Sequence, residues 1–399
     1  MGRDPYEFHD WVRPLGEKYV CADCVGDYGL RRFIAAHAVH KRCSYCGKEN
    51  RRPIAAPIND VTVFIYESVM TEHELAVNSL YYESAEGGYQ GPTTDFYDLI
   101  RDGGLLESDN EELITDVLEA LPHLEPLVPK RFFYDETGEL RYTWKKFCEH
   151  VTHRQRYVFS EARTGHARKA NFRREGEPYE ILTKLGAMTR ALHMTRTLKA
   201  STIIYRGREH SLTKLYKSAK ELGIPPADRA SQSRMSAAGI PVFYGALDEE
   251  TTRAEVESAN PGKPVITIGK FEILRPLRVL DLANPVDVPS IFDVSRRNER
   301  SGRAFLRAFT ADISRPIERD DRIHVEYVPT QIVAEYFRHV FRDAHGRRLD
   351  GILYPTAKKR DGACCVLFLD RDDCVDDVIS GKALCLVATS RSVKRRRKS

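Results

Sequence analysis

The sequence predicts an α+β protein in which a mainly helical N-terminal part precedes a C-terminal domain built on a mixed sheet. Apolar residues in the first half recur at helical spacing, whereas the second half alternates short runs of β-branched and aromatic residues with helical segments. Two closely spaced cysteine pairs near the start predict a small metal-bound module. With 399 residues, the chain is long enough for two or three domains with cores of their own.

The composition is that of a globular protein, with a hydrophobic share of 42% and a charged share of 30%. The formal net charge of +4 is too small to indicate a nucleic-acid partner by itself, so that question stays open. The basic residues 394–398 lie in a segment, 391–399, that we expect to be a solvated tail. No run approaches the length of a membrane span and the start lacks the apolar core of a signal peptide, so we expect a cytoplasmic protein without a membrane partner.

The first segment, residues 1–58, carries the most specific spacing in the chain. Two Cys-x-x-Cys pairs enclose 18 residues, and four thiolates fill a tetrahedral structural zinc site without leaving an open position for chemistry. Nine cysteines, an odd number, also fit reduced thiols better than a disulfide framework. The four ligands that the spacing predicts are Cys21, Cys24, Cys43 and Cys46. We expect His37 and His40, between the pairs, to be ordinary helix or surface residues.

Residues 59–160 have the pattern of a helical domain. A capping box formed by Ser108 and Glu111 opens one predicted helix, which Pro122 ends. A second amphipathic helix is indicated by Trp144, Phe147, Cys148 and Val151 at positions i, i+3, i+4 and i+7. Residues 161–180 are rich in charge and lack an apolar period, so they are predicted to be a linker.

The C-terminal domain is predicted over residues 181–390. Its helices are expected at 181–198, 212–222, 248–257, 301–309 and 329–341, and its strands at 202–205, 241–247, 264–282 (two strands or one bent strand), 351–354 and 364–369. Adjacent Cys364 and Cys365 in the last strand are expected to pack in the core, because no positive partner is evident that would activate them.

The domain is organised around the stretch 233–257, a turn followed by a strand and a capped helix. It places Arg234 before the strand, Tyr244 within it and Glu255 in the second turn of the helix. An arginine can grip a pyrophosphate, an aromatic ring can stack on a heterocycle, and a carboxylate can stabilise positive charge on a ribose carbon. These residues would suit cleavage of a nucleotide glycosidic bond, although an ordinary strand beside a capped surface helix explains the same residue types.

A resemblance to a known family favours the first interpretation. The runs 204–208 (IYRGR), 233–244 (SRMSAAGIPVFY), 250–256 (ETTRAEV), 327–331 (YVPTQ) and 350–356 (DGILYPT) resemble the RES domain. The resemblance covers about half the chain. It implies an ADP-ribosyltransferase-like fold and an NAD-consuming, toxin-like activity. The cysteine ribbon and helices before it are similar to the HEPN/RES N-terminal arrangement.

The resemblance also implies roles for particular residues. Arg206 and Arg234 would contact phosphate or ribose, Tyr244 the nicotinamide end, and Glu255 the ribose. Glu257 is the rival carboxylate, but two residues further along a helix it would face away. These roles require the four side chains of Arg206, Arg234, Tyr244 and Glu255 to converge on one pocket.

Two further positions complete the set that the resemblance implies. The family's serine falls where this chain has Thr356, which keeps the hydroxyl but adds a stiff methyl group. Gln331 could bind an amide of the substrate, although an exposed helix glutamine is the simpler interpretation. The catalytic set implied by the resemblance is therefore Glu255, Tyr244, Arg206 and Thr356, and the NAD-binding set is Arg206, Arg234, Tyr244 and Gln331.

The expected function is cleavage of the nicotinamide–ribose bond of NAD, with phosphate, water or a protein side chain as acceptor. Such an enzyme could belong to a toxin–antitoxin or defence system and be restrained by an antitoxin or inhibitory protein, and a homodimer is left open. The alternative is a zinc-ribbon RNA-binding or ribonuclease protein with a degenerate RES-like domain. An Arg-to-His spacing typical of HEPN ribonucleases, Arg32 to His37, lies within the cysteine segment and not on the long helices, which argues against that chemistry.

Overall fold

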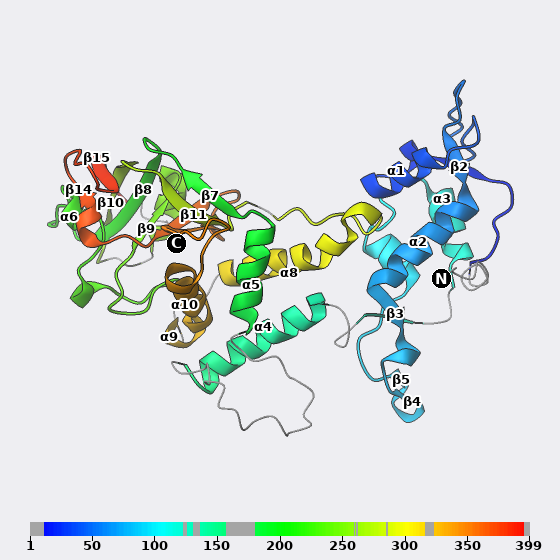
Figure 1. Ribbon diagram of the computed structural model, residues 1–399, viewed down its shortest axis with the longest axis horizontal. Helices are drawn as coiled ribbons and strands as arrows, with labels where there is room; N and C mark the ends of the chain where they lie inside the picture. The colour runs from blue at the N-terminus through cyan, green and yellow to red at the C-terminus, as the bar shows by residue number, and fades with distance from the viewer. Residues whose placement is uncertain are drawn as a thin grey trace. The chain divides into compact units, whose positions relative to one another are not determined.

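The computed structural model describes residues 12–122, 126–130, 136–156, 180–258, 260, 262–284, 286–315 and 323–394 (Figure 1). The chain forms two compact units. Unit 1 comprises Met1–Glu139 and Asp287–Ala304, and unit 2 comprises Leu140–Val286 and Phe305–Ser399. These limits differ from the predicted domain boundaries in two ways, because the helix around Trp144 packs in unit 2 and a segment from the C-terminal half packs in unit 1.

Unit 1 is mainly helical, with three small two-stranded sheets among its described residues. Strands β1 and β2 pair antiparallel, as do β3 with β6 and β4 with β5. The elements are β1 Tyr19–Cys21, α1 Tyr28–Ala36, β2 Ala55–Pro57, α2 Ile58–Glu72, β3 His73–Leu75, β4 Tyr82–Glu83, β5 Gly88–Tyr89, α3 Glu111–Ala120 and β6 Leu127–Pro129.

The core of unit 1 lies between α1, α2 and α3 and includes residues far away in sequence. Ile291 and Phe292 are buried in it with exposed fractions of 6% and 3%. The ring of Phe292 lies 5.9 Å from that of Phe64 on α2, which in turn stacks on Phe33 of α1. The segment Asp287–Ala304 is therefore part of the folded unit and completes its core.

Unit 2 is built on a nine-stranded mixed sheet with the order β14-β15-β10-β8-β9-β13-β12-β11-β7. The β11–β12 and β14–β15 pairs are parallel and the other neighbours are antiparallel. The strands are β7 Thr195–Leu198, β8 Ile203–His210, β9 Phe243–Ala246, β10 Val265–Ile273, β11 Leu277–Asp281, β12 Gly351–Pro355, β13 Ala363–Leu367, β14 Cys374–Val375 and β15 Leu384–Val393.

Helices cover the two faces of this sheet unequally. One face, called the helical face, packs its Leu280, Ile352 and Val366 against α4, α5, α8 and α10. The opposite face packs Phe243, Leu353 and Cys365 with the short helix α6. The helices are α4 Glu136–His153, α5 Glu180–Ala191, α6 Ala219–Leu222, α7 Glu249–Val256, α8 Arg297–Ser314, α9 Ile323–Glu326 and α10 Val328–Glu335, which continues as a π-helical turn over Tyr336–Val340.

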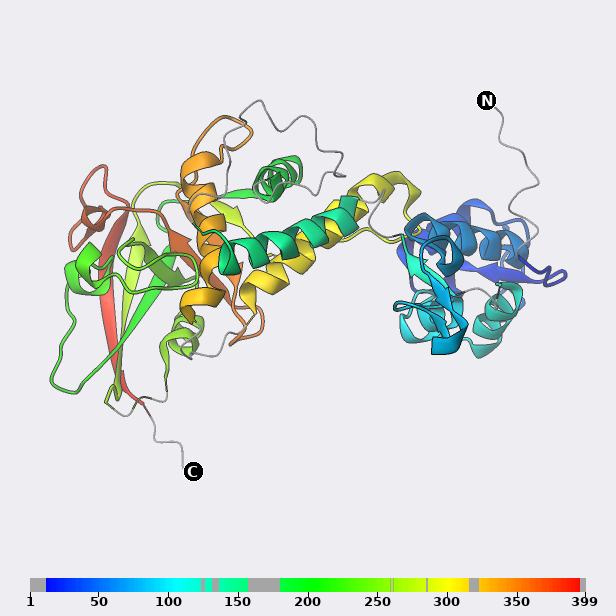
Figure 2. The same ribbon diagram turned by 90° about the horizontal axis from the view of Figure 1, so that it is seen from below.

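In unit 2, helix α4 lies beside the second half of α8 (Figures 1 and 2). The indole of Trp144 on α4 packs edge-on against Phe309 of α8 at 4.9 Å, and its Nε1 donates to Asp312 Oδ2 at 2.8 Å. Phe147 and Val151 are buried on the same side of α4. The amphipathic helix predicted from these residues is confirmed, and its buried stripe belongs to the core of unit 2.

Several predicted elements need correction. The helix expected over 212–222 shrinks to α6, because its N-cap Ser218 and the Gly223 that follows leave it only one turn. Leu212 and Leu215 are exposed. The helix expected over 181–198 ends at Ala191, and the remainder forms β7. The capping box expected at Ser108 is wrong: Asn110 caps α3, and the Ser108 hydroxyl donates to the carbonyl of Cys24.

Two predicted segments lie partly outside the described residues. The linker predicted over 161–180 does so up to its last residue, Glu180, which begins α5. In the predicted tail 391–399, residues 391–393 belong to β15 and pair with β10, whereas 395–399 are not described. Among the described residues, no helix is long and apolar enough to cross a membrane.

Candidate functional site

The four predicted metal ligands of unit 1 come together. Sγ of Cys21 lies 3.7 Å from that of Cys24 and 3.6 Å from that of Cys46, and the sulfurs of Cys24 and Cys43 are 3.6 Å apart. All four sulfurs lie within 4.8 Å of one another. Four thiolates arranged tetrahedrally at about 2.3 Å from one zinc ion would be separated by about 3.8 Å, so the cluster fits such an ion.

The histidines between the cysteine pairs face elsewhere. Nδ1 of His37 lies 2.9 Å from the carbonyl of Phe33, and Nδ1 of His40 lies 2.9 Å from that of Arg42. Their rings stack on Phe33 and Tyr19 respectively. The donor set is therefore the four sulfurs, which leave no open position for a reacting ligand, and the expectation of ordinary histidines holds.

In unit 2, a turn over residues 233–236 is clamped from two sides. Its ends bond each other through the main chains of Ser233 and Ser236. Nε2 of Gln331 donates to the carbonyls of both, at 2.9 and 3.2 Å. The hydroxyl of Tyr244 accepts from the amide of Met235 at 2.9 Å. Gln331 is buried, so the expected alternative of an exposed glutamine is wrong, and its amide supports the turn.

The guanidinium of Arg234 caps the C-terminal end of α8. Its Nη1 donates to the carbonyl of Ile313 at 2.7 Å and its Nη2 to that of Arg315 at 2.8 Å, while its Cζ lies 5.5 Å from the ring centre of Tyr327. A cation at this position satisfies helix carbonyls that otherwise lack donors. Both terminal nitrogens of Arg234 are thus engaged by protein rather than directed into open space.

Glu255 and Thr356 form a pair that closes the gap between α7 and the loop after β12. The Thr356 hydroxyl donates to Glu255 Oε1 and itself accepts from the amide of Lys358 at 3.0 Å. Lys358 Nζ donates to the main-chain carbonyl of Glu255 at 2.8 Å. The helix begins at Asp248, the predicted N-cap, whose side chain accepts from the amide of Thr251. Glu257 is the C-cap residue just beyond the helix and is exposed, so the end of the helix, and not the expected helical phase, sets its position.

An open hollow of about 540 Å³ lies beside this pair, between the last turn of α8 and the end of β12. Its volume falls in the range of roughly 300 to 1,000 Å³ that is typical of ligand sites. Of the predicted site residues, Thr356 lines it, and Arg234 holds the carbonyls of its α8 wall. The lining residues are Ala311, Asp312, Ser314, Arg315, Pro355, Thr356 and Ala357.

Tyr244 and Tyr354 lie on the helical face between the clamped turn and the Glu255–Thr356 pair. Tyr244 packs against the core of that face, and burial raises its pKa to about 12. Burial also raises the pKa of Tyr354, with smaller contributions from Cys364, Tyr244 and Glu255. Both phenols are therefore neutral at ordinary pH. Arg234, Gln331, Tyr244, Glu255 and Thr356 thus belong to one face of the sheet.

Arg206 does not join them. Its strand pairs Tyr205 with Ala246, so the alternation along β8 turns the Arg206 side chain to the opposite face. There its Cζ lies 5.0 Å from the ring centre of Phe243, and Nη1 donates to the main-chain oxygen of Tyr244 at 2.7 Å. Burial, with the neighbouring Arg208, lowers the pKa of Arg206 to about 9. The expectation that Arg206 shares one pocket with Arg234, Tyr244 and Glu255 is wrong.

The sequence did not reveal three residues that build the site. Asp312 lines the hollow and is held by Trp144, and nothing in its local sequence marks it. Tyr354 and Lys358 flank Thr356, so the segment quoted for the family resemblance could have suggested them. Cys364 and Cys365 behave as expected, because burial raises the pKa of both thiols and disfavours the reactive thiolate.

Comparison with protein families matches two parts of the chain. Residues 36–164 match the model described as HEPN/RES N-terminal domain 1, and residues 204–388 match the model described as RES domain. No curated protein and no solved structure gave a significant match. The RES match runs from Ile204 in β8 to Ala388 in β15 and includes the Glu255–Thr356 pair. The other match begins at the last residue of α1 and includes α2, α3 and α4. The chain therefore contains a segment that matches the RES domain, preceded by a segment that matches HEPN/RES N-terminal domain 1.

Proposed function

We propose that the RES domain cleaves the bond between nicotinamide and ribose in NAD at the Glu255–Thr356 pair. The observation that supports this most strongly is the position of that pair beside a hollow of about 540 Å³ in a RES domain. Loss of nicotinamide leaves cation-like charge on the ribose carbon, in the same way as glycoside cleavage does. A carboxylate next to that carbon stabilises the transition state more than the ground state.

Thr356 and Lys358 orient the carboxylate. The hydroxyl donates to one oxygen of Glu255, and the Lys358 side chain fixes the main chain at the same residue. With one oxygen held in this way, the second carboxylate oxygen would be available to the ribose. A serine at position 356 would supply the same hydrogen bond, so the threonine here is compatible with the family role.

The two arginines that the family resemblance suggested receive different roles. Arg234 shapes the hollow by holding the end of α8, and Arg206 stabilises the sheet from the other face. Contact of either with a pyrophosphate would require its present bonds to be released. Arg315, exposed on the hollow wall, is placed to meet a phosphate without such a change.

The cysteine cluster would hold a structural zinc ion, with Cys21, Cys24, Cys43 and Cys46 as ligands. Four thiolates saturate the ion, so it would stabilise the fold of unit 1 and take no part in NAD chemistry. In a cell, uncontrolled cleavage of NAD would be harmful. We therefore place the protein among cytoplasmic toxin-like enzymes that need restraint by an antitoxin or another inhibitory partner.

Incubation of the purified protein with NAD tests the proposal, with zinc content verified and products separated in the presence and absence of inorganic phosphate. Nicotinamide release is expected in every case. ADP-ribose would identify water as the acceptor, its 1″-phosphate would identify phosphate, and labelled protein would identify a side chain. An intact NAD pool after prolonged incubation would overturn the proposal, and salt-dependent RNA binding or cleavage would then favour the alternative.

A further inference from the structure

The segment Asp287–Ala304 lies inside the residues that match the RES domain, yet it is part of unit 1. It leaves the sheet after β11 and returns as α8. Ile291 and Phe292 supply apolar side chains that unit 1 buries, so this stretch behaves as an inserted clasp. We call residues 287–304 the clasp.

Helix α1 is shaped to receive the clasp. A Cβ atom at Gly29 would lie 2.8 Å from the main-chain carbon of Phe292 and 2.9 Å from the amide nitrogen of Asp293. Such distances are closer than real Cβ contacts allow, so only glycine permits this approach. A glycine in the first turn of a helix otherwise costs stability relative to alanine, which indicates that packing against the clasp is the reason for it.

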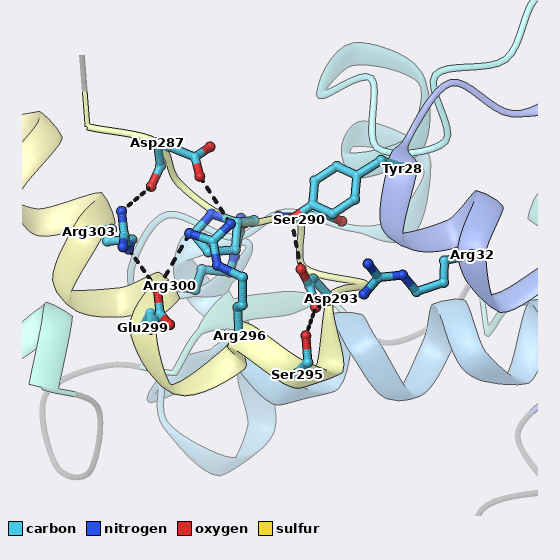
Figure 3. A network of polar contacts seen from close by, with 11 residues as sticks. Tyr28, Arg32, Asp287, Ser290, Asp293, Ser295, Arg296, Glu299, Arg300 and Arg303 are labelled. Atoms are coloured by element: carbon cyan, nitrogen blue, oxygen red, sulfur yellow. Dashed lines mark hydrogen bonds and ion pairs between the residues drawn. The ribbon is translucent and has the colours of Figure 1, made fainter. Parts of the chain in front are cut away.

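Polar contacts fix the clasp on the same helix (Figure 3). The N-cap Asp27 accepts at one oxygen from two α1 amides and from the Ser290 hydroxyl, the last at 2.8 Å. The Tyr28 hydroxyl donates to Asp293 Oδ2 at 3.0 Å and accepts from the Ser290 amide at 3.1 Å. The hydroxyls of Ser295 and Tyr28 lower the pKa of Asp293, which keeps it an anion in this buried position.

A second anchor lies further along the clasp. Arg300 Nε donates to Glu72 Oε1 at 2.5 Å, at the end of α2, and its Nη1 donates to the carbonyl of Pro289. Figure 3 shows Arg300 among Asp287, Arg296, Glu299 and Arg303, which bond one another within the clasp. The first turns of α8 are thereby held in unit 1.

The receiving helix lies between the two cysteine pairs. Its N-cap Asp27 follows Cys24 by three residues, and Cys43 follows the last residue of α1 by seven. A metal ion bound by all four cysteines closes this loop on both sides of α1, and binding free energy of that kind becomes folding free energy. Without the ion, the loop between the two cysteine pairs is no longer closed, and the ends of α1 are no longer held at fixed distances from the cysteines.

The clasp is continuous with the wall of the candidate site. Helix α8 runs from Arg297 to Ser314 without a break, so its first half belongs to unit 1 and its second half to unit 2. Its last turn supplies Ala311, Asp312 and Ser314 to the hollow. The carbonyls of Ile313 and Arg315 at this end of α8 accept hydrogen bonds from Arg234.

We propose that metal binding by Cys21, Cys24, Cys43 and Cys46 regulates the NAD site through the clasp and α8. With metal bound, α1 is held in the position in which it contacts the clasp. The docked clasp then stabilises the first turns of α8. Because α8 is continuous, its last turn at the hollow is stabilised as well. Loss of metal releases the clasp and loosens that wall. The importance of the wall for catalysis rests on the proposed function, whereas the linkage from metal to α8 does not.

Amide hydrogen exchange on the full-length protein tests the linkage with a readout independent of activity. Three samples are compared with a control variant. They are zinc-loaded native protein, native protein after chelation, and zinc-loaded Gly29→Val, which places side-chain atoms where the clasp backbone lies. Ala35→Val introduces the same residue, valine, at an exposed position of α1 and is the matched control. Zinc content of both variants is measured so that a loss of metal is not mistaken for a loss of docking.

Chelation and Gly29→Val are each expected to raise exchange about tenfold or more over residues 288–304, with a smaller rise over 305–314. Ala35→Val should match native protein in both regions. Unchanged exchange over 288–304 after chelation would overturn the dependence of the clasp on metal. A rise confined to 288–304, with 305–314 unchanged in both perturbed samples, would overturn transmission to the hollow.

Discussion

The cysteine cluster and the Glu255–Thr356 site differ in how much of their geometry is local in the sequence. Each cysteine pair brings two ligands together within four residues, so the spacing alone predicts the cluster. The pair Glu255 and Thr356 is 101 residues apart and meets only when α7 and the loop after β12 pack on the same sheet face. A local motif therefore predicts a metal site well, whereas a dispersed site needs the register of the whole sheet.

The largest effect is expected at the metal cluster. Cys43→Ser removes one ligand and should abolish stoichiometric zinc binding, because a three-thiolate site loses much of the roughly 10 to 16 kcal/mol that a structural zinc site can supply. Metal analysis after dialysis and circular dichroism measure the loss of zinc and of helical structure in unit 1. His37→Ala, in the same segment, should keep the metal, and zinc retained by Cys43→Ser would break the assignment.

Variants of Arg206 test whether this residue stabilises the sheet from the face opposite the Glu255–Thr356 site. Arg206→Ala should lower the free energy of unfolding by about 2 to 4 kcal/mol, since it leaves a cavity beside Phe243 and a lost hydrogen bond. Arg206→Met keeps the volume and removes a buried charge, so it should recover most of that stability. Denaturant unfolding measures both.

The same two variants separate a structural from a binding role. With Arg206 packed on the face opposite Tyr244, Arg206→Met should leave KM for NAD close to the native value. A KM raised tenfold in a variant with native stability would mean that the Arg206 guanidinium reaches the substrate and that the two faces are less separate than described.

Variants of Thr356 test whether NAD cleavage depends on a hydroxyl at position 356 and not on threonine itself. Thr356→Ser should retain nearly native NAD cleavage, and Thr356→Val should lose about tenfold or more, because it keeps the shape and removes the donor to Glu255. Initial rates at saturating NAD measure the difference. Equal activity of the valine and serine variants would show that Glu255 needs no help from position 356.

A further expected effect concerns pH. The pKa of Tyr244 is raised to about 12 by burial, above its ordinary value of 10, so the unfolded chain releases this proton first as pH rises. Ionisation of Tyr244 therefore lowers the free energy of unfolding progressively between pH 10 and about 12. Below that range Tyr244 does not change the free energy of unfolding with pH. Tyr244→Phe should make the decline in unfolding free energy with pH shallower there. If the unfolding free energy of Tyr244→Phe declines with pH as steeply as that of the native protein, the phenol of Tyr244 is exposed to water and not buried.

The sequence predicts the presence of helices and strands better than the residues at which they begin and end. The strands around Tyr244, the pair of strands over 264–282 and the helix capped by Asp248 follow from local pattern and are confirmed. The helix expected over 212–222 does not form as such, because Leu212 and Leu215 find no core to face. Apolar period alone does not say whether a partner surface exists.

The site is predictable in its parts and not in its convergence. Tyr244 and Thr356 share a face because β9, β13 and β12 pair in one register, and a slip of one residue would reverse every strand side chain. That same alternation sends Arg206 to the other face. Glu255 reaches Thr356 from helix α7. The engagement of Arg234 with the end of α8 also depends on a helix nearly 80 residues away.

The role of Glu255 in NAD cleavage is tested most directly by comparing Glu255→Gln with Glu257→Gln, two isosteric changes two residues apart. Nicotinamide release at saturating NAD is measured for both variants, and their zinc content and unfolding are checked against native protein. Glu255→Gln should lose at least about 100-fold in rate while Glu257→Gln, at an exposed position, stays near native. Native rates from Glu255→Gln, or an equal loss in both variants, would contradict the assignment of the reaction to the Glu255–Thr356 pair.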